Sequence, residues 1–214
     1  MTNGIYVAVH NQSRVPLVSD EGLFIPTGSS AYIGVKRTFY YRLSSPFSDC
    51  RKDVDTTLDT DSDYFIKTKK ITQYSRRLCY RVCFQYKYVY ENCNCTDPSI
   101  PVAEVSDPIC HSVANLTCVD NQRTKFDKSS IEKACNDDCP EECDSVEYET
   151  RLSMAKYPSG YYTDVLGQQN GLSQKFNANG AKPSTSQLSE SLVHLTVYYE
   201  TLKSTGEYPI IGVN

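Results

Sequence analysis

Ten cysteines constrain this 214-residue chain more than any other feature, because all of them lie between residues 50 and 143. Three Asn-x-Ser/Thr sequons accompany them, at Asn11, Asn94 and Asn115. An even number of clustered cysteines together with sequons favours folding in an oxidising, extracellular compartment. We expect oligosaccharides on Asn11 and Asn115. We discount Asn94, because a glycan between two neighbouring cysteines would be crowded.

The spacing of the cysteines suggests how they pair. Residues 70–91 contain no Gly or Pro and carry apolar side chains every four positions, which predicts a helix with Cys79 and Cys83 on one face. The downstream segment CNDDCPEEC repeats the spacing of four, so the two segments can be cross-linked in antiparallel order. The nested pairing that follows is Cys50–Cys143, Cys79–Cys139, Cys83–Cys135, Cys93–Cys118 and Cys95–Cys110.

Spacing does not select this pairing by itself, since ten cysteines allow roughly 945 pairings. Zinc coordination is the alternative, with Cys79-x3-Cys83 and Cys93-x-Cys95 as ligand pairs. Zinc sites usually combine two matched pairs, and ten thiols are too many for one site. We therefore favour disulfides, worth about 2–4 kcal/mol each, and expect no metal. A segment cross-linked in this way is stiff and suits the transmission of motion.

Composition and motifs argue against several other functions. The net charge of −4 gives no reason to expect binding to nucleic acid. His10, His111 and His194 have no recognisable nucleophile partner, so we expect no catalytic residue and no cofactor. The most apolar segment, residues 192–199, has the length of a strand, and no signal peptide opens the chain. We expect the chain to be part of a larger protein.

The pattern of the remaining segments predicts an α+β fold. Alternating residues indicate strands, whereas the cysteine-rich middle indicates helices, including a second one that begins near residue 127. A short helix is expected after Pro158, and a polar, flexible loop over 168–187. The expected strands cover residues 4–11, 31–43, 145–155 and 189–203.

Several blocks of the sequence resemble the extracellular domain of the degenerin/epithelial sodium channel family, which includes acid-sensing channels. The resemblance runs in order over about residues 4–203. The blocks that carry it are VAVHNQSRVPLVSDEGLFIPTGSSAYIGVKR, SSPFSDC, CYRVCFQYKYVYENCNC, CNDDCPEECDSVEYETRLSMAKYPS and HLTVYYETLK.

The resemblance implies a subunit that assembles as a homo- or heterotrimer around a sodium-selective pore in the plasma membrane. The extracellular part of such a subunit is compared to a hand, whose disulfide-laddered thumb couples a stimulus to membrane helices that this chain lacks. The alternative is a stand-alone secreted, disulfide-rich binding module. The implied division is palm and β-ball strands in 1–49, thumb in 50–144, returning palm strands in 145–204, and a tail toward the second membrane helix in 205–214.

The resemblance also implies roles in gating for four residues. Phe47 matches an aromatic residue at the wrist, which presses on the first membrane helix, and Pro46 matches its neighbour. Leu202 and Lys203 match the short linker between palm strands that repacks during desensitisation. Lys203 replaces the Asn that is common in acid-sensing members.

Other matches are incomplete. Asp120 matches a thumb carboxylate of the acidic pocket in proton-gated members, but Thr124 stands where the next pocket carboxylate is expected. Paired carboxylates raise each other's pKa, so the broken pair argues against gating by protons, and the stimulus stays open among protons, peptides and mechanical force. Cys135-x3-Cys139 is also wider than the Cys-x-Cys of acid-sensing channels.

Overall fold

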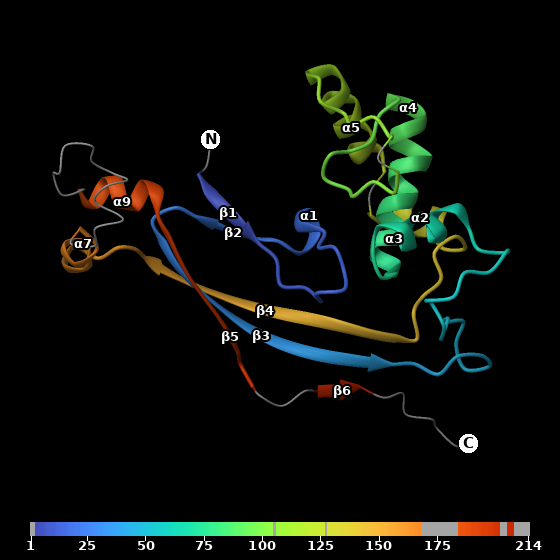
Figure 1. Ribbon diagram of the computed structural model, residues 1–214, viewed down its shortest axis with the longest axis horizontal. Helices are drawn as coiled ribbons and strands as arrows, with labels where there is room; N and C mark the ends of the chain where they lie inside the picture. The colour runs from blue at the N-terminus through green and yellow to red at the C-terminus, as the bar shows by residue number, and fades with distance from the viewer. Residues whose placement is uncertain (1–2, 105, 127, 168–183, 202–204, 208–214) are drawn as a thin grey trace. The chain divides into compact units, whose positions relative to one another are not determined.

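The computed structural model describes residues 3–104, 106–126, 128–167, 184–201 and 205–207 (Figure 1). The chain forms two compact units. The strand unit comprises residues 1–9, 21–37 and 148–204. The helical unit comprises residues 10–20, 38–147 and 205–214, and it therefore contains all ten cysteines. The α+β class expected from the sequence is confirmed.

Two sheets contain the described strands. In the first, β1 (Gly4–Val7) pairs antiparallel with β2 (Leu23–Pro26). In the second, β3 (Ser29–Tyr41) lies between β4 (Asp144–Lys156) and β5 (Val193–Tyr199) (Figure 1). β5 runs parallel to β3 from the pair Ser29–Val193 to the pair Val35–Tyr199. β6 (Thr205–Glu207) pairs with the end of β3.

The core of the strand unit follows the two-residue period of β3. Ala31, Ile33 and Val35 are buried and pack with Ile25 of β2. Alternate side chains of a strand point to the same face, so these residues form one apolar surface. The strand was predicted from its β-branched and aromatic residues, and the structure adds that one of its faces is buried.

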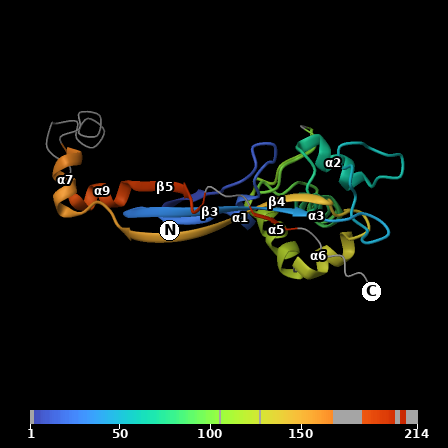
Figure 2. The same cartoon turned by 90° about the horizontal axis from the view of Figure 1, so that it is seen from below.

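Two short helices complete the strand unit. α7 (Gly160–Gly167) and α9 (Thr185–Ser191) lie side by side in Figures 1 and 2. α9 was not predicted, and it begins with a capping box between Ser184 and Gln187. The polar loop expected over 168–187 lies mostly outside the described residues, and its last residues form the first turn of α9.

The helical unit contains a segmented helix where one continuous helix over 70–91 was expected. α2 (Asp63–Ile71) ends at Thr72, whose backbone is extended, and α3 (Arg76–Phe84) begins after Ser75. Ser75 caps α3 by accepting a hydrogen bond from the N–H of Leu78, which favours a new helix start at this point. The π-helical turn η1 (Gln85–Tyr90) and α4 (Glu91–Cys93) then continue α3.

Three further helices belong to this unit, and two of them were not predicted. α1 (Val18–Glu21) and α5 (Val113–Lys125) lie in segments for which the sequence predicted neither a helix nor a strand. Ser112 caps α5 through the N–H of Asn115. The helix expected from about residue 127 is present as α6 (Lys128–Cys135), close to α5 in Figure 2.

The core of the helical unit combines aromatic rings with sulfur. The rings of Phe65 and Tyr74 are 4.5 Å apart, and both side chains are fully buried with Phe84. Leu78 and Val82, one turn apart on α3, form a second cluster with Leu17. The core is completed by the buried half-cystines Cys79, Cys83, Cys95, Cys110, Cys135 and Cys139.

Candidate functional site

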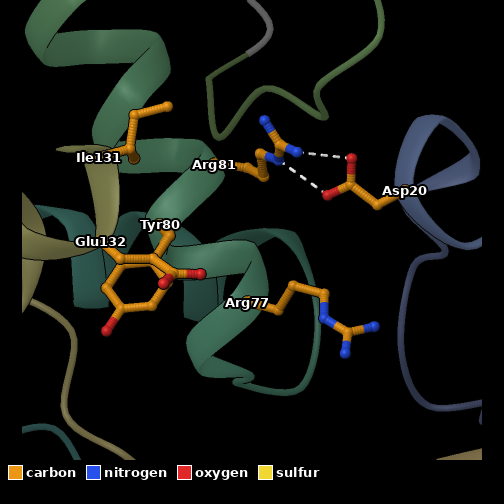
Figure 3. A pocket seen from close by; sticks show the side chains of 6 residues that line it. All are labelled: Asp20, Arg77, Tyr80, Arg81, Ile131 and Glu132. Atoms are coloured by element: carbon orange, nitrogen blue, oxygen red, sulfur yellow. Dashed lines mark hydrogen bonds and ion pairs between the residues drawn. The ribbon is translucent and has the colours of Figure 1, made fainter. Parts of the chain in front are cut away.

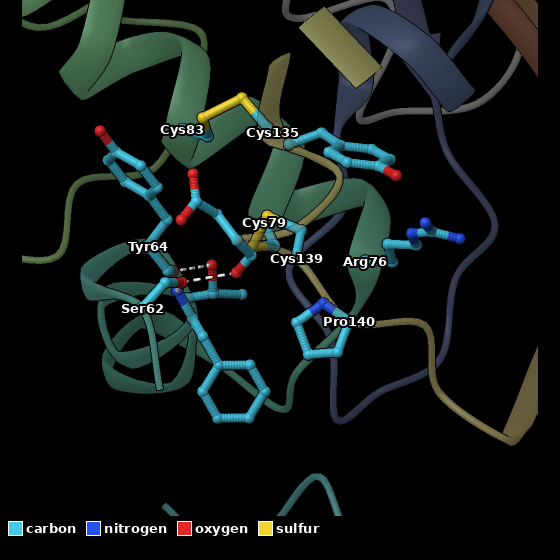
Figure 4. The surroundings of a disulfide bond; sticks show 12 residues. Ser62, Tyr64, Arg76, Cys79, Cys83, Cys135, Cys139 and Pro140 are labelled. Carbon is cyan, nitrogen blue, oxygen red and sulfur yellow. Dashed lines mark hydrogen bonds between the residues drawn. A yellow bond between two sulfur atoms is a disulfide. The ribbon is translucent and has the colours of Figure 1, made fainter. Parts of the chain in front are cut away.

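The disulfide ladder of the helical unit is the feature from which the candidate site is built. Two disulfides lie one above the other and join α3 to α6 and the segment after it (Figure 4). Their Cα atoms are 5.7 Å apart in Cys79–Cys139 and 6.3 Å apart in Cys83–Cys135. With Cys50–Cys143, Cys93–Cys118 and Cys95–Cys110, they are the five pairs of the nested arrangement derived from the spacing.

We call the end of the helical unit around Cys93–Cys118 and Cys95–Cys110 the tip. Cys93–Cys118 joins α4 to α5, and Cys95–Cys110 closes the loop between them. Beside the second disulfide, the N–H of Thr96 donates to the carbonyl of Pro108 at 2.7 Å, and the N–H of Cys110 donates to the carbonyl of Thr96 at 2.9 Å.

Polar contacts hold the loop of the tip against the helices. Asp97 has no exposed side-chain surface and accepts hydrogen bonds from Arg123 of α5, the shortest at 2.5 Å. The hydroxyl of Tyr86 donates to Asp107. Burial, and then this hydrogen bond, raise the pKa of Tyr86, so the phenol stays protonated. The loop is thus fixed by a disulfide, an ion pair and a hydrogen bond from a phenol to a carboxylate.

We call the opposite end of the ladder, around Cys50–Cys143, the base. Backbone hydrogen bonds surround this disulfide: the N–H of Arg42 donates to the carbonyl of Cys143, and the N–H of Cys143 donates to the carbonyl of Arg51. Arg42 also forms an ion pair with Glu141. Because Arg42 follows β3 and Cys143 precedes β4, the base ties the ladder to the ends of both strands.

A buried carboxylate lies next to the base. Glu142 is 8% exposed, forms an ion pair with Arg14 at 3.3 Å, and accepts from the N–H of Arg76 at 3.1 Å. Arg76 is the first residue of α3, and a negative charge is favourable at a helix N-terminus. Glu142 thereby fixes the start of α3 and the segment before α1.

Phe47 lies in a tight turn close to the base. Its N–H donates to the carbonyl of Ser44 at 3.1 Å, and the peptide bond before Pro46 is cis. The hydroxyl of Ser48 closes the turn by donating to the carbonyl of Leu43 at 2.7 Å. The ring of Phe47 is 65% exposed, so it is not a core aromatic residue of this chain. Leu202 and Lys203 lie outside the described residues.

Comparison with known proteins decides which family has this architecture. A family model described as amiloride-sensitive sodium channel matches residues 1–206. The chain belongs to this family. The membership expected from the resemblance is therefore confirmed, and the family consists of ion channels rather than enzymes.

Individual members of the amiloride-sensitive sodium channel family match nearly the whole chain. The epithelial sodium channel subunit gamma of Neoceratodus forsteri is 28% identical, over 96% of this chain and 30% of its own length. The degenerin-like protein unc-105 of Caenorhabditis elegans is 31% identical, over 98% of this chain and 23% of its own length. Degenerin del-1 of the same species is 26% identical, over 93% of this chain and 27% of its own length. The chain thus spans about a quarter of the length of the curated relatives it matches.

Asp120 of this sodium channel family member lies on the surface of α5. Its side chain is 72% exposed, and its carboxylate is 3.6 Å from Arg123. Thr124 donates its hydroxyl back to the carbonyls of Asp120 and Asn121 within the helix. Thr124 therefore hydrogen-bonds to the backbone of its own helix, at the position where the resemblance predicts a carboxylate. The charged neighbour of Asp120 is the cation of Arg123 instead.

A shallow pocket on the helical unit was not expected from the sequence (Figure 3). Arg81 of α3 forms a forked pair with Asp20 of α1, with hydrogen bonds of 2.6 and 2.8 Å. These two residues are 61 positions apart, so no local pattern could have paired them. The other lining residues are Arg77, Tyr80, Ile131 and Glu132.

The thiols and histidines of this channel family member are engaged in structural contacts. All ten cysteines are in disulfides, and the described residues contain no group of three or more His, Cys, Asp and Glu that could hold a metal ion. His194 bonds Ser30 at 2.9 Å and stacks on Tyr157. His10 and His111 contact nearby backbone carbonyls. Within the described part of the chain, every helix is too short or too polar to cross a membrane.

Proposed function

We propose that this chain is part of the extracellular region of a trimeric sodium channel subunit at the plasma membrane, and that its helical unit is the thumb. In this proposal the thumb receives a chemical or mechanical stimulus and relays it to a sodium-conducting, amiloride-sensitive pore in the lipid bilayer. Other copies of the subunit, or related subunits, complete the trimer. The family membership of the chain supports this assignment.

The observation that carries the proposal is the continuous series of disulfides from base to tip. Five cross-links join segments 15 to 93 residues apart in the sequence, and all of them lie inside the helical unit. Cross-links restrict the separation of the helices that they join. A stimulus that displaces one end of such a unit is therefore transmitted to the other end instead of being absorbed by internal rearrangement.

The base supplies the point at which motion would leave the ladder. Phe47 is three residues before Cys50, and its turn is closed by side-chain and backbone hydrogen bonds. A large aromatic ring that is 65% exposed on a fixed turn is suited to contact a surface outside this chain. We propose that this surface is the first membrane helix and that Pro46 sets the direction of the turn.

Other expected roles belong to the same proposal. Residues 1–49 and 145–204 would form palm and β-ball, with Leu202 and Lys203 in the linker that repacks. Asn11 accepts hydrogen bonds from Ser13 within its own sequon, and Asn115 is half-buried in the first turn of α5. We propose glycans at both. Asp120 is proposed to act as a solvated surface carboxylate rather than as half of a proton-sensing pair.

The substitution Phe47→Ala in the full-length subunit tests the relay. We expect the stimulus-evoked sodium current to fall strongly while the amount of channel at the cell surface stays close to wild type, because the ring contributes little to the core. Current recording combined with surface biotinylation measures both quantities.

Tyr161→Ala is the matched control, since Tyr161 of α7 is an aromatic residue that is 83% exposed and lies away from the ladder in the sequence. Its current should remain unchanged. Equal currents for wild type and Phe47→Ala would remove Phe47 from gating. A full-length protein recovered from the medium instead of the membrane would favour the stand-alone secreted module.

A further inference from the structure

Asn94 occupies an unusual place in the tip. It follows α4 with a left-handed backbone (φ 54°, ψ 28°), and its N–H donates to the carbonyl of Tyr90 at 2.9 Å. The side chain is exposed, and its amide has no hydrogen-bond partner among the described residues. Asn tolerates this backbone conformation better than other residues with a Cβ atom. The side chain of Asn94 is thus open to solvent although the residue lies between two half-cystines.

The other two residues of the sequon, Cys95 and Thr96, are buried. Cys95 is 3% exposed and bonded to Cys110, and Thr96 is fully buried. The hydroxyl of Thr96 donates to the carbonyl of Pro108 at 3.0 Å. An enzyme that modifies Asn-x-Thr must bind the hydroxyl together with the asparagine. It cannot do so after the loop has closed, although the asparagine itself stays accessible.

We propose that Asn94 carries an N-linked oligosaccharide and that it receives this group only before the Cys95–Cys110 disulfide forms. The donor is a polyprenyl diphosphate-linked oligosaccharide. The side-chain nitrogen of Asn94 attacks the first sugar carbon, a C–N bond forms, the bond from that carbon to the phosphate oxygen breaks, and the amide loses one proton as polyprenyl diphosphate leaves. The inference rests on the proposed extracellular location.

The two reactions compete because the disulfide is quick to form. Cys95 and Cys110 are 15 residues apart, the shortest separation among the five pairs. Closing a short loop costs less chain entropy than closing a long one. Once the disulfide is made, Thr96 enters its buried position and the sequon is lost as a substrate. Molecules of this protein should therefore differ in whether their tip carries a glycan.

Mass spectrometry of peptides from the natural full-length protein, expressed in animal cells, tests the proposal. Enzymatic removal of N-glycans in heavy-oxygen water marks each occupied asparagine. We expect partial occupancy of Asn94 under normal conditions and higher occupancy when dithiothreitol is present during synthesis. Asn11, which lies outside every disulfide-closed segment, serves as the internal reference and should not change.

Two variants complete the test. Asn94→Gly removes the acceptor and keeps a residue suited to the left-handed backbone. The glycosylated protein should therefore migrate faster in gel electrophoresis, by the shift expected for the loss of one glycan. Cys110→Ala prevents loop closure and should raise Asn94 occupancy without reductant.

An unmodified Asn94 under all these conditions would overturn the site. Complete glycosylation of Asn94 that changes neither with reductant nor with Cys110→Ala would contradict the proposed competition between glycosylation and disulfide formation. Absence of glycan from Asn11, Asn94 and Asn115 together would instead contradict the proposed extracellular location.

Discussion

At the scale of single residues, Arg51 organises the loop that precedes α2. Its guanidinium pairs with Asp61 and lies 4.4 Å from the centre of the Phe65 ring. Burial opposes ionisation of Asp61, but hydrogen bonds from Arg51 and from the N–H of Leu58 outweigh it and lower the pKa of Asp61. A carboxyl whose native pKa lies below its unfolded value of about 3.9 stabilises the fold above that pH. This contribution disappears as the pH falls through the native pKa.

The substitution Asp61→Asn should therefore lower the free energy of unfolding at pH 7. The difference from wild type should shrink as the pH falls below about 4, where the carboxyl of the unfolded wild-type chain binds a proton, and should vanish below the lowered pKa of the folded state. Urea denaturation between pH 3 and 7, with the disulfides intact, measures it. Asp59→Asn, at an exposed position two residues earlier, is the control and should have little effect. A difference that does not vary with pH would contradict this role of the ion pair.

At the scale of elements, Cys83–Cys135 joins α3 to α6, and Cys79–Cys139 joins α3 to the segment after α6. The double substitution Cys83→Ala/Cys135→Ala should reduce the free energy of unfolding by about 2–5 kcal/mol, because it releases a long closed loop in the unfolded chain and both sulfurs are fully buried. Guanidinium denaturation provides the measurement.

The matching variant at the tip is Cys93→Ala/Cys118→Ala. Cys93–Cys118 closes a segment of 25 residues, whereas Cys83–Cys135 closes one of 52. We expect a smaller loss there, because the loop is shorter and the half-cystines are less buried. If both double variants unfolded at the wild-type denaturant concentration, the ladder would not be a source of stability.

At the scale of the whole molecule, the cross-links are confined to one of the two units. Every disulfide joins two residues of the helical unit, whereas the strand unit relies on β-pairing and the cluster around Ile25, Ile33 and Val35. Reduction should therefore increase amide hydrogen exchange in α3, α5 and α6 while the paired residues of β1 and β2 remain protected. Hydrogen exchange with peptide-level mass spectrometry measures this, and an equal rise in both units would contradict it.

Features that depend on short-range periodicity could be predicted from the sequence. The spacing of four in Cys79–Cys83 and again in Cys135–Cys139 led to the same disulfides that the structure contains. β-branched and aromatic residues identified the long strand β3, and alternation identified β4. The break at Thr72 and the start of α5 were missed, because a serine cap is a single-residue signal that helical periodicity does not reveal.

The sequence by itself predicted the α+β class and suggested the nested order in which the structure pairs the cysteines, because composition, alternation and helical spacing are local properties of the chain. Only the tertiary structure decided that Phe47 is exposed, that Asn94 is accessible while Thr96 is buried, and that Asp20 meets Arg81. These outcomes depend on packing between segments far apart in the sequence. The period of a strand indicates which of its faces is buried, but the exposure of these particular residues follows from packing between distant segments.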